Sequence, residues 1–236
     1  MVAPNFAEAF DIISWHNPEY QNLIHEFQDF ISDHSELNGR KILVLGTGTG
    51  HFSIRAALNF PESEIWHVEY NKEMLEESRI KCGSLKINNI VFIENHPHSF
   101  ETLDKFDLII SINTLFTQSD PKNLLDKICN NWTKENSLLF LNDIGKTLNF
   151  RKIKNTIICD LIRNKGVEKT INILNQGNLY LEYENQIEKN QKSGIFWKHS
   201  LQKLKKMIIN SNFSILKTKS TYFDFSNLVI ARKFHI

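Results

Sequence analysis

The feature that most constrains this chain is the run KILVLGTGTGHFS, residues 41–53, in which a short apolar segment leads directly into a glycine-threonine alternation. Gly46, Gly48 and Gly50 fall at every second position after the apolar segment. Glycines at the end of a strand allow a sharp turn and let a ligand approach where a Cβ would clash. A helix that follows such a turn points its first N–H groups into the same crevice. A tight turn without a ligand is the simpler alternative, but such a turn does not require three glycines.

An acidic residue lies at the matching place after the next apolar segment. Glu69 ends EIWHVE, residues 64–69, and lies 23 residues after Gly46. In the dinucleotide-binding fingerprint, an acid about 20 residues beyond the first glycine binds a ribose hydroxyl. The NAD-type pattern G-x-G-x-x-G would need a glycine where this chain has His51, and the phosphate-binding pattern G-x-x-x-x-G-K-[ST] is absent. The two features together predict a site for a nucleoside ligand of another kind.

Strand-like and helix-like segments alternate after residue 40, which predicts an α/β fold with a doubly wound, mostly parallel sheet. The predicted strands are 41–46, 64–69, 89–94, 106–112 and 137–143, and the predicted helices between them are 51–59, about 71–82, and about 120–132. After a helix near 200–210, residues 213–219 and 225–233 are separated only by STYFD. Because this connection is too short for a crossover helix, the last two strands are predicted to form an antiparallel hairpin.

Two segments do not follow the alternation. Near the N-terminus, Asn17-Pro18 is typical of a helix start, and one face of the helix that follows is apolar. That face consists of Leu23, Ile24, Phe27, Phe30 and Ile31. Residues 146–195 contain two predicted helices and the stretch NLYLEYENQ, residues 178–186.

Composition narrows the function classes. The chain has 236 residues, 41% of them hydrophobic, and a net charge of +1, which argues against a dominant nucleic-acid or membrane-surface function. The start MVAPNFAEAFDII lacks the basic and apolar regions of a secretory signal, and no apolar run approaches the roughly 18 residues of a membrane span. Three scattered cysteines fit a reducing compartment. We therefore expect a cytoplasmic protein.

The glycine run VLGTGTG, the segment HVEYNKEML with Glu69, and FDLIISINTLF together resemble motifs of the class I S-adenosylmethionine (SAM)-dependent methyltransferases. The resemblance covers roughly residues 38–145 and 197–233, and it implies a Rossmann-like, seven-stranded sheet with an antiparallel last strand. It implies SAM as cofactor and S-adenosylhomocysteine (SAH) as product. The implied cofactor-binding residues are Gly46, Thr47, Gly48 and Gly50 around the methionine and ribose, Glu69 on the ribose hydroxyls, Tyr70 and Met74 beside the adenine, and Asn113, Thr114 and Leu115 near the sulfonium.

Two positions depart from the pattern of that family. Val44 stands where many members have an acidic residue, so the amino group of the methionine part needs another acceptor. The run ENHPH replaces an adenine-binding aspartate, and either Asn95 or His96 is expected to substitute for it. His96 and His98 also raise the alternative of a shared metal, but no third ligand is identifiable, and no metal is predicted.

The segment FAEAFDIISWHNPEY, residues 6–20, is predicted to cover the cofactor as a lid. Phe6, Phe10, Trp15 and Tyr20 are its candidate contacts, with plain core packing as the alternative. This segment also resembles the opening segment of carboxy-SAM synthases. His16 is the first candidate for a catalytic base, and a solvent-facing residue at a helix end is the alternative.

The acceptor is expected to lie beneath residues 146–195, where members of the family insert a substrate cap. The candidate pocket residues are Tyr180, Glu182, Tyr183, Phe196 and Trp197. Asp143 at the end of the fifth strand either touches substrate or caps the following segment. The run from Asn113 to Phe116 occupies the place of the N-P-P-[YF] motif of amino methyltransferases but lacks both prolines.

We expect one domain, divided into an N-terminal lid (1–39), a SAM-binding core (40–145), a cap (146–195) and a completion of the core (196–236). The predicted function is methyl transfer from SAM to an oxygen or nitrogen of a small-molecule acceptor. One alternative is an RNA or protein methyltransferase that uses a basic face, composed of Lys152, Lys154, Arg163, Lys198, Lys203, Lys205 and Lys206. The others are a non-catalytic SAM-binding protein and carboxy-SAM-type chemistry. The oligomeric state is not indicated.

Overall fold

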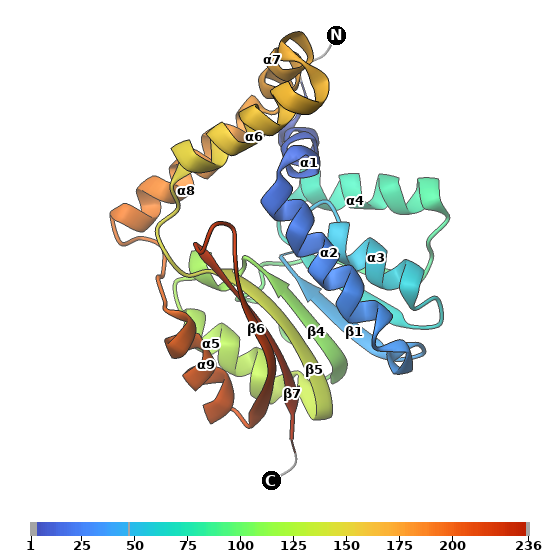
Figure 1. Cartoon of the computed structure of the whole chain (residues 1–236). Helices are drawn as coiled ribbons and strands as arrows, with labels where there is room; N and C mark the ends of the chain where they lie inside the picture. The colour runs from blue at the N-terminus through green and yellow to red at the C-terminus, as the bar shows by residue number, and fades with distance from the viewer. Residues whose placement is uncertain (1–3, 47, 235–236) are drawn as a thin grey trace.

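The protein is described by a computed structural model over residues 4–46 and 48–234, and its centre is one seven-stranded sheet (Figure 1). The strands are β1 (Lys41–Leu45), β2 (Glu64–Glu69), β3 (Ile90–Glu94), β4 (Phe106–Ile112), β5 (Thr133–Ile144), β6 (Phe213–Thr221) and β7 (Ser226–Lys233). Their order across the sheet is β3-β2-β1-β4-β5-β7-β6. The pairs from β3 to β5 are parallel, and β7 is antiparallel to both β5 and β6. This topology confirms the predicted fold class, including the terminal hairpin.

Helices cover both faces of the sheet, as a doubly wound fold requires. On one face, α2 (Pro18–Ser32) and α3 (His51–Asn59) pack on the side chains of alternate strand positions, such as Ile42, Val44 and Ile110. On the other face, α5 (Pro121–Asp126), η3 (Lys127–Asn131) and α9 (Leu201–Asn210) pack on Leu43 and Ile109. Figure 1 shows these two helical layers with the sheet between them.

The start of α2 forms as the sequence predicts. The side chain of Asn17 accepts hydrogen bonds from the N–H groups of Glu19 and Tyr20, and Pro18 is the first helical residue. The predicted apolar face is buried, since Leu23, Ile24, Phe27, Phe30 and Ile31 all belong to the core. A short helix, α1 (Phe6–His16), precedes it, and η1 (Ser35–Leu37) connects it to β1.

A second helical group lies over the carboxyl ends of the strands. It consists of α1, α6 (Phe150–Lys165), α7 (Val167–Gln176) and α8 (Asn178–Lys192), which stand above the sheet in Figure 1. These helices share a core that includes Ile13, Ile153, Ile157 and Leu181. The stretch NLYLEYENQ is therefore the start of a third helix, α8, rather than an irregular addition to two helices.

Smaller differences concern element ends. α4 (Lys72–Leu85) continues one turn beyond the predicted end, and β5 begins at Thr133 instead of 137. The other short element, η2 (Leu115–Thr117), follows β4 directly. Within the described ranges, no helix is both long enough and apolar enough to cross a membrane.

Candidate cofactor and acceptor site

A cavity of about 410 Å³ lies where the carboxyl ends of β1, β2 and β4 meet α1 and α8. Its walls include the glycine turn after β1, the acid that ends β2 and the turn after β4. In open α/β sheets, ligands bind at this edge, where the strand order reverses. Here the order reverses between β1 and β4, which are neighbours in the sheet.

The glycines after β1 are required by backbone conformation and by close neighbours. Gly46, Gly48 and Gly50 have φ angles of +66°, +54° and +90°, which side chains disfavour. A Cβ on Gly46 would overlap the hydroxyl of Thr114, and a Cβ on Gly50 would overlap that of Ser78. Gly46 and Gly48 line the cavity, whereas Gly50 precedes α3 and packs against α4. Thr47 lies outside the described residues.

Glu69 is buried at the end of β2 and lines the cavity. Its Oε2 accepts a hydrogen bond from the N–H of Gly48 at 3.1 Å, and its Oε1 accepts from the N–H groups of Tyr70 and Asn71 at 2.9 Å each. Burial raises the pKa of this carboxyl, against the three backbone hydrogen bonds. A carboxylate offers about four acceptor positions, so Oε2 retains one for a ligand hydroxyl.

The turn after β4 is held by its neighbours. The N–H of Asn113 donates to the carbonyl of Asn142 at 2.7 Å, and the Asn113 side chain accepts from Nδ2 of Asn142 at 2.9 Å. Asn113 has a φ of +50°, a conformation that asparagine tolerates better than most residues. Asn113 and Thr114 line the cavity, whereas Leu115 is fully buried behind it.

The α1 helix covers the glycine turn. Phe6 and Phe10 line the cavity, and Phe10 Cε1 lies 3.2 Å from where a Cβ of Gly48 would be. Tyr20, Tyr180 and Tyr183 complete an aromatic wall, on which Phe10 and Tyr180 meet edge to face at 5.0 Å. Tyr70 and Met74 also line the cavity. These positions were all site predictions from the sequence.

An ionic cluster attaches α1 to the neighbouring helices. Oδ1 of Asp11 lies 3.0 Å from Nε2 of His51, and the same carboxylate accepts hydrogen bonds from Thr49 and Lys81. Burial alone would raise the pKa of Asp11, but the hydrogen bonds from these partners and the charge of His51 lower it. No sequence pattern indicates this cluster, because its four members come from three separate segments.

Several predicted residues lie outside the cavity lining. Trp15 is 63% exposed, and His16, at the end of α1, is near Lys165 and Asp160 of α6. Trp197 packs beside His199, with ring centroids 4.5 Å apart. None of these three side chains lines the cavity.

Asp143 binds the turn after β4 instead of the segment that follows it in the sequence. Its Oδ1 accepts hydrogen bonds from the N–H groups of Leu115 and Phe116 at 3.0 and 3.3 Å, and its Oδ2 lies 3.0 Å from Nε2 of His199. Burial raises the pKa of this carboxyl, and the contacts with His199 and the two N–H groups oppose the rise. Asp143 thus supports the turn after β4 from behind the cavity.

The predicted adenine partners lie at the border of the cavity. Pro97 contributes to the lining, and neither Asn95 nor His96 does. The ring of His96 lies 5.0 Å from the ring of Tyr70, measured between centroids. The N–H of Asn95 donates to the carbonyl of Glu69, which continues the pairing of β3 with β2. Among the described residues, no group of three or more His, Cys, Asp or Glu side chains is placed to hold a metal.

Residues that the sequence analysis did not single out complete the lining. Glu184 and Ile187 belong to α8, Gln118 follows η2, and Tyr222 belongs to the turn between β6 and β7. The helical spacing of Tyr180, Glu184 and Ile187 was a usable signal, since residues four and three apart share a face. Tyr222 and Gln118 had no comparable signal.

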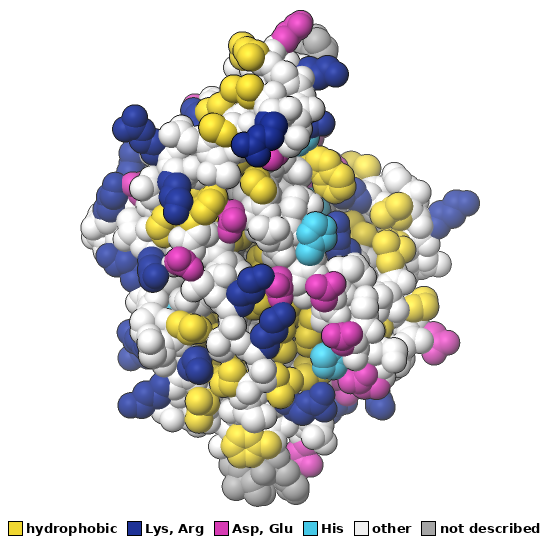
Figure 2. Space-filling model, in the orientation of Figure 1, with side chains coloured by type: hydrophobic (Ala, Val, Ile, Leu, Met, Phe, Trp, Pro, Cys, Tyr) yellow, Lys and Arg dark blue, Asp and Glu magenta, His cyan; other side chains and the backbone are white. Residues whose placement is uncertain are grey.

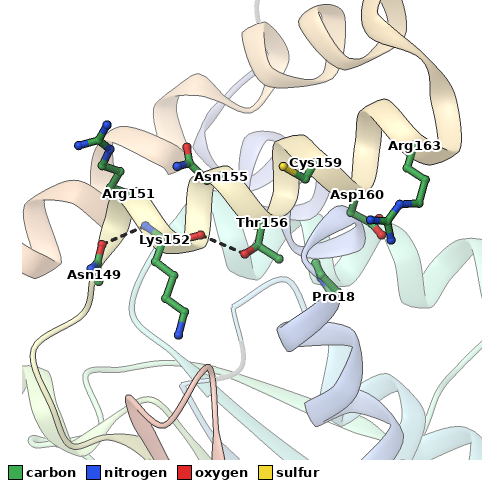
Figure 3. Close-up of a pocket in the computed structure, with 9 residues that line it drawn as sticks. All are labelled: Pro18, Asn149, Arg151, Lys152, Asn155, Thr156, Cys159, Asp160 and Arg163. Carbon is green, nitrogen blue, oxygen red and sulfur yellow. Dashed lines mark hydrogen bonds between the residues drawn. The ribbon is translucent and has the colours of Figure 1, made fainter.

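A second hollow, of about 530 Å³, is open to the surface between α6 and the start of α2. Figure 3 shows the side chains that line it, among them Arg151, Lys152, Arg163 and Asp160. It shares no lining residue with the cavity beneath α1 and α8. Neither the glycine turn nor Glu69 contributes to the lining of this hollow.

The cavity beneath α1 fits the cofactor that the resemblance implies. The glycine turn has no side chains that would keep a bulky ligand away from its backbone. Glu69 retains a hydrogen-bond acceptor position for a ribose hydroxyl, and Tyr70 and Met74 offer apolar contact to the adenine ring. Val44 is fully buried within β1, so no acid contacts the ligand from that position.

Comparison with known proteins agrees with this arrangement. A family profile described as "Methyltransferase domain" matches residues 36–196. A malonyl-[acyl-carrier protein] O-methyltransferase of Ilyobacter polytropus is 31% identical over 121 residues, which cover 51% of this chain and 45% of that protein. An (S)-coclaurine N-methyltransferase of Papaver somniferum is 29% identical over 112 residues, covering 47% of this chain and 32% of that protein. The chain therefore spans less than half the length of these relatives.

Among solved structures, magnesium protoporphyrin IX methyltransferase from Synechocystis PCC 6803, with bound SAH, aligns with a TM-score of 0.62 and 15% sequence identity. The alignment covers 91% of this chain and 84% of that one. At this identity, the likeness concerns the fold. Because the family profile covers well over half of the sequence and the sheet has the expected strand order, this protein belongs to the class I SAM-dependent methyltransferases.

Proposed function

We propose that this protein transfers the methyl group of SAM to a nitrogen or oxygen atom of a small-molecule acceptor. The observation that carries the proposal is the cavity itself, which joins the glycine turn and Glu69 to an aromatic wall contributed by α1 and α8. Helices lie over the strand ends where a macromolecule would otherwise approach (Figure 1). A cavity of about 410 Å³ is within the range that small ligands occupy.

The chain's residues would hold SAM along the strand ends. Gly46 and Gly48 admit the methionine and ribose parts, Glu69 accepts the ribose hydroxyls, and Tyr70 and Met74 pack beside the adenine. Asn113 and Thr114, fixed by Asn142 and by backbone carbonyls, would lie next to the sulfonium. When bound, SAM supplies an electrophilic methyl group for in-line displacement.

The protein's part in this reaction is positioning and exclusion of water. Phe6, Phe10 and Tyr180 close the cavity from above with apolar surface. Burial raises the pKa of Tyr20 and Tyr180, so these hydroxyls stay protonated at physiological pH. The Tyr20 hydroxyl lies 3.0 Å from Nδ1 of His51, and the Tyr180 hydroxyl forms a hydrogen bond with Glu184, so both contribute neutral polar groups to the cavity wall.

Similarity to these relatives does not indicate whether the methylated atom is nitrogen or oxygen, because one is named as an O-methyltransferase and another as an N-methyltransferase. Each alignment covers less than half of the relative's sequence. The choice of acceptor atom must come from the cavity.

The open hollow along α6 is the feature that favours a macromolecular acceptor. It carries Arg151, Lys152 and Arg163, but Asp160 lies among them and the cavity is lined by other residues. In Figure 2, Lys and Arg side chains are dispersed over the visible face with Asp and Glu among them. RNA binding through this hollow would show a steep salt dependence.

The first test is calorimetric titration of SAH into the protein and into Glu69→Ala. We expect binding by the wild-type protein and a loss of about tenfold or more in the variant, because the ribose hydroxyls lose a charged hydrogen-bond acceptor. Glu64→Ala is the matched control, since Glu64 begins the same strand and its side chain is exposed. Absence of SAH binding by the wild-type protein would overturn the cofactor assignment.

Turnover distinguishes the remaining alternatives. Labelled methyl groups from SAM should appear in low-molecular-mass products when a metabolite extract is supplied. Label in RNA or protein alone would favour the macromolecular alternative, and SAH binding without any labelled product would favour a non-catalytic role. Conversion of the labelled SAM itself into carboxy-SAM would indicate carboxy-SAM-type chemistry.

A further inference from the structure

Glu184 is a carboxyl group in the cavity to which the resemblance assigns no contact with the cofactor. It projects from α8, is 4% exposed and lines the cavity. Its carboxyl group forms a hydrogen bond with Tyr180, but Oε2 has no hydrogen-bond partner in the described part of the chain. Burying a carboxyl oxygen without a hydrogen-bond partner costs free energy. A bound ligand that hydrogen-bonds to this oxygen would remove that cost.

Gln118 presents a second oxygen of the same kind. Its Nε2 donates to the carbonyl of Thr114 at 2.8 Å and to Oγ1 of Thr117 at 3.0 Å. These two bonds fix the orientation of the amide, so the unpartnered atom is the acceptor Oε1. Several buried side-chain nitrogen and oxygen atoms of the described residues have no hydrogen-bond partner. Two of these atoms, Oε2 of Glu184 and Oε1 of Gln118, belong to residues that line the cavity. When Glu184 is ionised, both atoms are acceptors, and a ligand that completes them donates hydrogen bonds.

The charge of the cavity limits the ligand further. Its lining contains the carboxyl groups of Glu69 and Glu184 and, among the described residues, no Lys, Arg or His. A methyl acceptor with a carboxylate or phosphate group would have no positively charged side chain to pair with in this lining. A cationic group would lie near a carboxyl group and the faces of several aromatic rings, which attract cations.

From these contacts we propose that the acceptor is an amine, held by Glu184 and Gln118, and that Glu184 takes the proton of the reacting nitrogen. This inference rests on the proposed methyltransferase function. Glu184 is thereby assigned as a catalytic residue of the acceptor half of the cavity.

The proton and electron balance is complete without another reactant. In the reactive state the amine is neutral, one N–H donates to ionised Glu184, and the nitrogen lone pair faces the methyl group. The N–C bond forms as the C–S bond breaks, and the electron pair of that bond remains on sulfur. The methylated nitrogen is then cationic, and its proton passes to Oε2 of Glu184. The carboxyl group returns this proton to solvent when the product leaves.

Glu184 has the proton affinity for this role. Burial raises its pKa to about 8, against the hydrogen bond from Tyr180. The titratable groups around it are Tyr180 and Tyr183 on α8, Tyr20 on α2, Tyr222 between β6 and β7, and Glu69 at the end of β2. Burial raises the pKa of each of these tyrosines. Glu69 is engaged by three backbone N–H groups, so Glu184 is the group free to exchange a proton.

The test compares three probes of one shape with SAH-loaded protein: 2-phenylethylamine, 2-phenylethanol and 3-phenylpropionate. Calorimetry should show the amine binding tightest and the carboxylate weakest. At pH 7, amine binding should release about one proton, because the ammonium ionises Glu184; this is read from titrations in buffers of different ionisation enthalpy.

Glu184→Gln should weaken binding of 2-phenylethylamine by about 10–100-fold, the effect of losing a charged hydrogen bond, and should abolish proton release. SAH affinity should stay unchanged in this variant, which also reports that it is folded. Glu182→Gln, an exposed position on the same helix, should behave as wild type.

Equal or stronger binding of the carboxylate, no binding of any of the three probes, or an unchanged amine affinity in Glu184→Gln would overturn the inference. Because SAH binding is measured first, these results leave the proposed cofactor function standing. Loss of SAH binding by the wild-type protein would instead overturn the proposed function and the amine inference together.

Discussion

At the scale of single residues, Gly48 shows why the glycine turn tolerates no side chain. Its φ is +54°, and a Cβ there would lie 3.2 Å from Phe10 Cε1 and 3.3 Å from Met74 Sδ. These neighbours belong to α1 and α4, so a side chain would push the lid away from the turn. The same residue donates its N–H to Glu69, so its backbone position also orients the predicted ribose acceptor.

We expect Gly48→Ala to weaken SAH binding by about tenfold or more, and to lower the free energy of unfolding by about 1–2 kcal/mol, the cost of a left-handed conformation for alanine. Calorimetry and urea unfolding measure the two effects. Gly83→Ala is the matched control, because Gly83 lies in α4 with no neighbour within 4 Å of the added Cβ. Alanine favours a helix there, so the control should match or exceed wild-type stability. Equal SAH affinity for Gly48→Ala would show that the turn does not contact the cofactor.

Glu184 should make stability depend on pH. Its pKa is about 8 in the folded protein, whereas the ordinary value for a glutamate is 4.5, so between these values the folded protein binds one proton that the unfolded chain has lost. Stability contributed by the neutral carboxyl is therefore present below pH 4.5 and falls as the pH rises toward 8.

The corresponding prediction is that Glu184→Gln, which cannot ionise, becomes progressively more stable relative to wild type as the pH rises from 4.5 to 8. The ratio of the two unfolding constants should change by up to about tenfold per pH unit, with a plateau above pH 8. Urea unfolding of both proteins across this range measures it. A pH-independent difference would mean that Glu184 is ionised throughout.

At the scale of elements, α1 depends on charged contacts as well as on apolar packing. Asp11 connects it to His51 at the start of α3, to Lys81 of α4 and to Thr49 of the glycine turn. The carboxylate is only partly exposed, with 22% of its side-chain surface accessible. Hydrogen bonds to a charged group in such a place contribute more to the free energy of unfolding than an ion pair exposed on the surface does.

We predict that Asp11→Asn lowers the free energy of unfolding by about 1–3 kcal/mol and increases amide exchange in α1. Both effects follow from the loss of charge beside His51 and Lys81. Because the pKa of Asp11 is lowered by these partners, its contribution is present above the ordinary carboxyl pKa and is lost as the pH falls below about 4. Hydrogen exchange read by mass spectrometry, with urea unfolding, provides the measurements.

Asp29→Asn is the control for this prediction, since Asp29 is exposed on α2. It should leave both the stability and the exchange of α1 unchanged within about 0.5 kcal/mol. Unchanged exchange in Asp11→Asn itself would show that aromatic packing alone retains the helix.

At the scale of the whole molecule, the cavity connects the sheet to the helices that stand over it. Its walls come from α1, α2, α4, α6, α8, the turn between β6 and β7, and the ends of the four neighbouring strands β2, β1, β4 and β5. A ligand that fills it contacts segments that are far apart in the sequence. Binding should therefore stabilise these segments together.

We expect saturating SAH to slow amide exchange in three places at once: the described part of the glycine turn (46 and 48–50), the turn at 113–118, and α1. The opening free energy there should rise by about 2.7 kcal/mol at a ligand concentration one hundred times Kd. Exchange at the residues that line the surface hollow along α6, such as Arg151 and Cys159, should change less, because Ile153 is the described residue of this helix that lines the cavity. Protection confined to that hollow would mean that SAH binds at a site other than the glycine turn.

Much of the fold was predictable because its local signals are strong. The strands β1, β2 and β4 are short apolar runs with clear ends, and Asn17-Pro18 marks the start of α2. The extent of β5 was missed because its first part, Thr133 to Asn136, is polar and exposed at three of four positions, which hides the start of the strand in the sequence.

The site was predictable where it follows the strand ends. Gly46, Gly48, Glu69, Asn113 and Thr114 all line the cavity, because parallel strands bring their carboxyl ends to one edge. Of the candidates in the predicted lid, Phe6, Phe10 and Tyr20 also line it, whereas Trp15 and His16 lie outside it. Helix α1 turns these two side chains away, since a helix exposes part of its surface to solvent.

By itself, the sequence determined the order of elements, the glycine turn and the acid that faces it, because these depend on periodicity and on the conformational freedom of glycine. Only the tertiary structure decided that Glu184, and not Glu182, enters the cavity. Periodic patterns define the faces of α8, but which face is buried depends on what packs against it. Here α1 and the turn after β4 enclose that face, and so place Glu184 and Gln118 in one cavity.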